Sequence, residues 1–272
     1  MIRRPAVAGQ FYSGSVSGLK EQVESCLDLN AERFDALGVV SPHAGLMYSG
    51  PVAGAVYSRI NMPDTFVILG PNHHGLGADF GIMTEGIWNM PFGDVRVDSM
   101  LAREIFKNCG SLEEDPFGQE REHSLEVQVP FMQYFSDSFQ IVPIALRHYS
   151  PDEGFLGVCE DIGNAIASVV SKVDSRVVIV ASTDFTHYQP QEVAEENDHA
   201  ALDAILSLDA GALFKEVSSR GISMCGYAPV AVMLTACKGL GASRAELVKY
   251  LTSGDTTGDY SAVVGYGGVV VR

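Results

Sequence analysis

Short apolar runs alternate along the chain with longer amphipathic stretches, which is the pattern of an α/β protein with a mostly buried sheet. The apolar runs are rich in β-branched residues and predict strands, and the stretches between them have apolar residues at helical spacing. The predicted strands cover residues 36–41, 65–70, 139–146, 176–182, 245–252 and 262–271. The predicted helices cover residues 15–29, 49–60, 98–108, 123–134, 152–171, 190–206, 209–218 and 226–238.

Residues 79–97 show neither the apolar runs of the strands nor the helical spacing of apolar residues, and they are expected to form short strands or irregular structure. They contain the only tryptophan, Trp88. The chain shows no internal repeat, no low-complexity tract and no linker long enough to separate two domains. We therefore expect one domain over residues 1–272. Its fold class is α/β, with a mixed, mostly parallel central sheet flanked by helices.

Composition narrows the function classes. The formal net charge is −16 and no stretch is rich in Lys and Arg, which argues against a nucleic-acid partner. No apolar run reaches the roughly 20 residues of a membrane span, and the two N-terminal arginines precede no apolar signal region. The five cysteines form no C-x-x-C pair, which is typical of reduced thiols. A cytoplasmic protein without a membrane partner is expected.

Histidines follow several predicted strands. His43 follows the first, in VVSPHAG; His73 and His74 follow the second, in VILGPNHHG; and the fourth leads to Asp184 and His187, in VVIVASTDFTH. Any one of them could be a loop residue or a helix cap. Ligands of open α/β sheets bind at the carboxyl ends of strands, so the recurrence predicts a shared site. Steric geometry allows one of the adjacent pair to face a given metal, and the other is expected to contact substrate or support a ligand.

Two further groups have both a structural and a functional interpretation. His123 stands near the predicted start of a helix, in EREHSLEVQVPF, where it either caps the helix or lines the pocket. Asp184 and His187 are three residues apart. They form either a carboxylate–imidazole pair for acid/base work or part of an Asx-type turn.

Cys225 lies in SMCGYAPV, directly before an apolar predicted helix. A thiol at a helix N-terminus has a lowered pKa, and it then becomes a good metal ligand or nucleophile. The alternative is a small buried hydrophobic residue, which is the role expected of Cys159 and Cys237. His148 and His199 are assigned no role.

The ordered motifs of the chain resemble those of the Memo family, called AmmeMemoRadiSam system protein B in prokaryotes. The resemblance extends from AGQFY near the N-terminus to SGDTTGDYSAVVGYGG near the C-terminus. The motifs between them are SPHAG at 41–45, LGPNHH at 69–74, EHSLEVQVPF at 122–131, STDFTH at 182–187 and CGYAP at 225–229.

The resemblance implies a fold similar to the catalytic subunits of class III extradiol dioxygenases, in which two histidines and a carboxylate hold iron. By this similarity His43 and His73 would be metal ligands, and Cys225 would replace the carboxylate. The implied cofactor is non-haem iron or copper, with zinc possible, because a thiolate favours metals that bind sulfur.

The resemblance also places His187, with Asp184, on the acid/base side of the site and His123 in the pocket lining. It implies a radical-SAM protein and a third component of the same system as partners, besides a small-molecule or peptide ligand. Three functions remain open: a metal-dependent redox enzyme, a scaffold that reuses the pocket for a protein partner, and metal-free thiol chemistry at Cys225 with His187 as base.

Overall fold

A computed structural model describes all 272 residues, and its twelve strands join in one sheet. The central strands β6, β8, β3, β9 and β2 are all parallel neighbours, whereas β12, β11, β10, β4 and β5 add antiparallel pairs at the sides. The strands are β1 (Ile2–Arg3), β2 (Gly38–Ser41), β3 (Thr65–Asn72), β4 (Phe80–Ile82), β5 (Ile87–Met90), β6 (Gly93–Val97), β7 (Glu113–Glu114), β8 (Gln140–Arg147), β9 (Val177–Ser182), β10 (His187–Gln189), β11 (Ala245–Thr252) and β12 (Val263–Val271).

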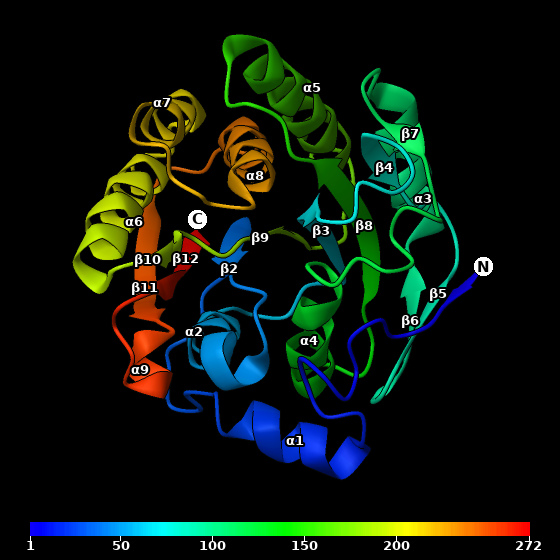
Figure 1. The fold of residues 1–272 in the computed structure, drawn as a ribbon. Coiled ribbons are helices and arrows are strands. Elements are labelled where there is room, and N and C mark those ends of the chain that lie inside the picture. The colour runs from blue at the N-terminus through cyan, green and yellow to red at the C-terminus, as the bar shows by residue number, and fades with distance from the viewer.

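Helices cover both faces of the sheet. Figure 1 shows α5, α7 and α8 on one side of the strands and α1, α2 and α4 on the other. No helix is both long and apolar enough to cross a membrane. The helices are α1 (Val16–Glu24), α2 (Leu46–Ser58), α3 (Ser99–Asn108), the 3-10 helix η1 (Glu126–Gln128), α4 (Val129–Phe135), α5 (Glu153–Val170), α6 (Gln191–Leu206), α7 (Ala210–Arg220), α8 (Tyr227–Gly239) and α9 (Gly254–Thr257).

The central strands lie inside the core. All eight residues of β3 and all six of β9 are buried, because helices cover the sheet on both sides. This explains why these strands are continuous apolar runs without polar alternation. The expected α/β class, with a mixed and mostly parallel sheet flanked by helices, is confirmed.

The strands that lead to the candidate residues are neighbours. β3 pairs with β9 and β9 pairs with β2, all in parallel, so their carboxyl ends lie side by side at one edge of the sheet. His73 directly follows β3, and Asp184 and His43 are each the second residue after their strands, β9 and β2. Residues far apart in the sequence are thus delivered to one place, as the pattern predicts.

The prediction of one helix over residues 123–134 is wrong at its start. The helical part begins only with η1 and α4, and His123 lies before it. The Glu122 carboxylate accepts hydrogen bonds from the backbone N–H groups of Ser124, at 2.8 Å, and His73, at 2.7 Å. These bonds tie the segment to the end of β3, so it cannot begin the helix.

Other differences are small. The helix predicted over residues 15–29 ends at Glu24, because the chain then packs against α2 so closely that a Cβ on Gly54 would lie 2.2 Å from the carbonyl oxygen of Cys26. Residues 79–97 form three short strands. The elements β1, β7, β10 and α9 are not predicted, since two to four residues are too short to show a period.

Candidate metal centre

Three imidazoles meet at the carboxyl edge of the sheet. His43, His73 and His123 each offer a nitrogen, and these nitrogens all lie within 4.8 Å of one another. The rings of His73 and His123 stack with centroids 4.6 Å apart, and His43 meets both edge-on. We call these residues the histidine cluster. His123 is therefore a possible ligand, in addition to lining a pocket, and it caps no helix.

The hydrogen bonds around His43 decide which of its nitrogens is free. The Ser182 hydroxyl donates its one proton to the Ser124 carbonyl, at 2.6 Å, and it lies 2.9 Å from His43 Nδ1. Since that proton is already used, the hydroxyl accepts from His43 Nδ1–H. The Nε2 atom then carries the lone pair. Burial, followed by the charge of His73, holds the pKa of His43 well below its usual value, so the ring stays neutral.

A carboxylate determines which nitrogen of His73 is free. Glu122 is fully buried, and its Oε1 accepts from His73 Nδ1 at 2.9 Å. Burial raises the pKa of Glu122, but the hydrogen bond and charge of His73, with the charge of His123, outweigh it and hold the pKa at about 2. An ionised carboxylate on Nδ1 leaves Nε2 free and raises its basicity, as in carboxylate–histidine–metal arrangements. Burial lowers the pKa of His123 to about 4, so this ring is also neutral.

The thiol of Cys225 adjoins the cluster through His43. Its Sγ lies 3.4 Å from His43 Nε2 and accepts the backbone N–H of Asp184 at 3.3 Å. The residue stands directly before α8, as predicted. The expectation of a lowered pKa is wrong, because burial and then the charge of Asp184 raise the pKa of the thiol well above its usual value. Without a metal ion the residue is a protonated thiol, which argues against metal-free nucleophilic chemistry.

Asp184 and His187 are not joined to each other by a hydrogen bond. The Asp184 carboxylate accepts the backbone N–H of His43 at 2.8 Å, and so it fixes the loop after β2. The ring of His187, which begins β10 and not a turn, has its Nδ1 2.9 Å from the carbonyl of Ser223. The two side chains interact through charge, since His187 lowers the pKa of Asp184 while burial, the larger effect, raises it.

Two other histidines lie close by. His74 belongs to a second group of possible metal donors with Glu122 and His123, whereas His73 belongs to the first. His148, to which the sequence assigns no role, follows β8 at the same edge, where its ring and that of Tyr227 have centroids 5.0 Å apart. The position of His148 after a strand is a signal in the sequence that could have identified it.

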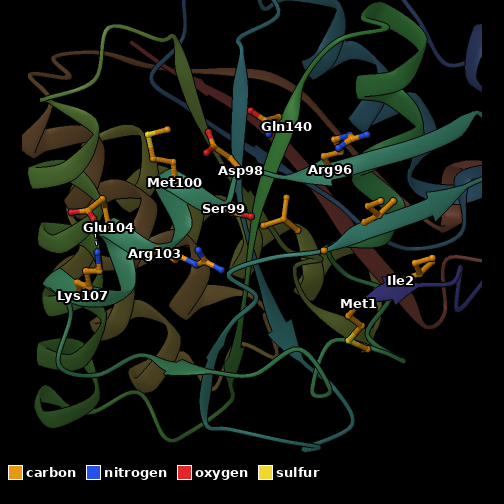
Figure 2. A pocket seen from close by; sticks show the side chains of 13 residues that line it. Met1, Ile2, Arg96, Asp98, Ser99, Met100, Arg103, Glu104, Lys107 and Gln140 are labelled. Carbon is orange, nitrogen blue, oxygen red and sulfur yellow. Dashed lines mark hydrogen bonds and ion pairs between the residues drawn. The ribbon is translucent and has the colours of Figure 1, made fainter.

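A cavity of about 900 Å³ lies elsewhere, between β6, α3 and the N-terminus, and none of the candidate residues lines it (Figure 2).

The three imidazoles of the histidine cluster lie close enough together that they could hold one metal ion, and Cys225 is not part of that group of donors. Bonds of roughly 2.0–2.3 Å to nitrogen and sulfur in a tetrahedral arrangement place donor atoms about 3.5 Å apart, and His43 Nε2 and Cys225 Sγ are 3.4 Å apart. The rings of His43 and His123 are neutral, so they need no deprotonation before binding. The thiol does, so binding should release a proton.

Replacing Glu122 by Gln should weaken metal binding by about 10- to 100-fold, the usual cost of losing an outer partner of a ligand. The amide keeps the shape but removes the charge that makes His73 basic. Competition of Zn²⁺ between the protein and a chromophoric chelator measures the affinity. Glu120→Gln removes the same charge from an exposed neighbour and should change affinity little. Equal affinities in the two variants would contradict the role given to Glu122.

The fold and this cluster define an α/β protein with a candidate metal centre at the carboxyl edge of its sheet. The family of Memo-like proteins matches residues 3–270, and the chain belongs to the Memo family. The resemblance seen in the sequence motifs is thus confirmed.

The relatives extend over the whole chain. A MEMO1 family protein of Methanopyrus kandleri is 41% identical over 100% of this chain and 99% of its own length. One from Methanosarcina barkeri is 42% identical over the full length of both. Among solved structures, an uncharacterized protein from Escherichia coli K12 has a TM-score of 0.54 at 12% identity, covering 85% of this chain and 98% of its own. That similarity shows the fold alone.

Proposed function

We propose that this Memo-family chain is a metal-dependent redox protein that binds one non-haem iron or copper ion at the histidine cluster and Cys225. One observation carries the proposal. The hydrogen bonds of Ser182 and Glu122 occupy the Nδ1 atoms of His43 and His73, so that Nε2 of each ring stays free within the histidine cluster, and His43 Nε2 lies 3.4 Å from the thiol of Cys225. A site built only to grip a peptide needs no such control of tautomers.

The ligand chemistry favours iron, copper or zinc, because imidazole and thiolate bind all three well. Bound iron or copper would supply one-electron redox chemistry, which zinc does not. Cys225 would be the anionic ligand, with the Asp184 N–H stabilising its sulfur at 3.3 Å. The same thiolate is oxidisable, so its environment must limit access of oxidants.

The remaining residues of the site would bind substrate and transfer protons. His187 is partly exposed and its Nδ1 is held by the Ser223 carbonyl, so its Nε2 is free to take or give a proton. Asp184 positions the loop that carries His43. His74 is exposed beside His123 and is placed to contact a ligand.

His187→Ala should keep the bound metal and lose oxygen chemistry. An oxygen electrode records the reaction of iron- or copper-loaded protein with O₂, with ascorbate as the reductant. The variant should slow oxygen uptake by about 10²- to 10⁴-fold, the usual contribution of a positioned acid/base group. Asp184→Asn should cause a smaller loss, because it changes a positioning contact and leaves the His187 ring intact.

His43→Ala protein with the same added metal measures the background from free ions. Oxygen uptake by wild type no faster than this background, or equal uptake in wild type and His187→Ala, would refute the redox function and favour a scaffold. The metal content and thermal melt of the His187→Ala and Asp184→Asn samples must match those of wild type for the comparison to count.

The partners follow from the family resemblance only. A radical-SAM protein and a third component of the same system are proposed as partners, and a cytoplasmic location is proposed for the chain. Co-purification of a tagged chain from its native cells tests the two partners, and fractionation of the same cells tests the location.

A further inference from the structure

A second feature adjoins the histidine cluster. A cavity of about 830 Å³ opens beside it, within the size range of small-molecule sites. One wall is the N-terminal segment and the other is the segment that carries His123. The lining includes Arg4, Val7, Phe11, His74, Arg121 and His123.

The N-terminal wall is held firmly in place. The buried carboxylate of Glu126 accepts the backbone N–H groups of Ala6, at 2.7 Å, and Val7, at 3.1 Å, and pairs with the guanidinium of Arg3 at 2.6 Å. Arg3 also lies 4.1 Å above the ring of Trp88. These contacts link the first residues of the chain to η1, so the wall is a fixed part of the fold and not a loose tail.

Each of the two walls presents one arginine without a carboxylate partner. Most arginines of the chain form an ion pair with Asp or Glu. Arg33 lies over the ring of Phe135, and Arg96 lines the separate cavity of Figure 2. The other exceptions, Arg4 and Arg121, both line the cavity beside the cluster.

Free guanidinium groups are unexpected here, because acidic residues outnumber basic ones by 34 to 18 in this chain. The cavity reverses that balance, since Glu120 is the one acidic side chain in its lining. Guanidinium forks match the geometry of carboxylate and phosphate oxygens. Phe11, whose ring meets His123 at 4.8 Å, offers an apolar face between the arginines and the cluster.

We propose that this cavity binds a small organic anion. Its carboxylate or phosphate group lies between Arg4 and Arg121, and its apolar body lies against Phe11 and Val7. Its opposite end reaches His123, and so the candidate metal centre. The proposal names the substrate class of the proposed function and rests on it for the reaction, but binding of the anion itself requires no metal.

The test uses metal-free protein in low salt. Benzoate and phenyl phosphate serve as anionic probes and benzyl alcohol as the neutral one, and ¹⁵N-labelled protein reports binding through the arginine Nε–H signals. Both anions should bind with saturable shifts, and benzyl alcohol should bind at least about 10-fold more weakly, since it lacks the charge that the guanidinium groups hydrogen-bond. Which anion binds more tightly distinguishes a carboxylate from a phosphate ligand.

Arg4→Gln and Arg121→Gln should each weaken the anions by about 10-fold and leave benzyl alcohol unchanged. Arg96→Gln is the matched control, an unpaired arginine in another cavity, and should have no effect. Absence of saturable anion binding, or an equal loss in Arg96→Gln, would overturn the proposal.

This result is separable from the proposed function. His43→Ala removes a metal ligand but no residue of the cavity lining, so anion binding should persist in it. If the protein binds the anions but shows no redox activity, the anion-binding proposal stands and the proposed redox function is wrong. If the protein shows redox activity but binds neither anion, the proposed redox function stands and an organic anion is not its substrate.

Discussion

His43→Ala should bind a metal ion more than about 100-fold more weakly than wild type, beyond what loss of an outer partner costs. His43 is the one residue that joins the two parts of the site, because it lies within the histidine cluster and also contacts Cys225. Its side chain is 2% exposed, so no other group can move in to replace it. Equilibrium dialysis against Zn²⁺ or Co²⁺ measures the loss.

His199→Ala is the control, since His199 is an imidazole on α6 whose Nδ1 bonds to its own helix at Glu195. It should bind metal as wild type does. Co²⁺ adds a second readout, because Cys225→Ser should abolish the thiolate-to-cobalt absorption. Unchanged binding in His43→Ala, with the fold intact by circular dichroism, would falsify the assignment of this centre.

Glu126→Ala should lower the free energy of unfolding by about 3–5 kcal/mol, the cost of leaving a buried charge without its partner. The unpaired group is Arg3, which is 1% exposed and pairs with Glu126 at 2.6 Å. The Tyr12 hydroxyl and the backbone of Ala6 and Val7 also lose their acceptor. Urea unfolding of the metal-free protein gives the difference.

Glu120→Ala serves as the control, because this glutamate is exposed and forms no ion pair; its effect should be within about 0.5 kcal/mol. The double variant Arg3→Met, Glu126→Leu should recover part of the loss, since apolar residues can replace a buried pair. A loss below about 1 kcal/mol in Glu126→Ala would contradict the structural role of the pair.

Several site residues are visible in local sequence because their position follows from strand order. A buried strand of an α/β fold must be a short apolar run, and whatever follows it lies at the carboxyl edge. His43, His73 and Asp184 are found in this way. His123 is only partly found, because the pattern suggests a helix start, whereas Glu122 ties this segment to the end of β3.

The cavity walls and the state of the thiol are not visible in local sequence. Arg3 pairs with a glutamate more than a hundred positions away, and no local period records such a contact. The N-terminal motif AGQFY supports the family resemblance without showing that its segment borders the candidate metal centre. The helix start beside Cys225 predicts a lowered pKa, but burial and Asp184 raise it.

The sequence by itself determined the α/β class, the central strands and the delivery of histidines to one edge, because alternating periods of apolar residues dictate which elements form and strand ends dictate where loops emerge. Only the tertiary structure decided which imidazole nitrogens are free and which arginines lack partners. Those properties depend on hydrogen bonds and charges between segments that meet only after folding. Ser182 beside His43, Glu122 beside His73 and Glu126 beside Arg3 are such contacts.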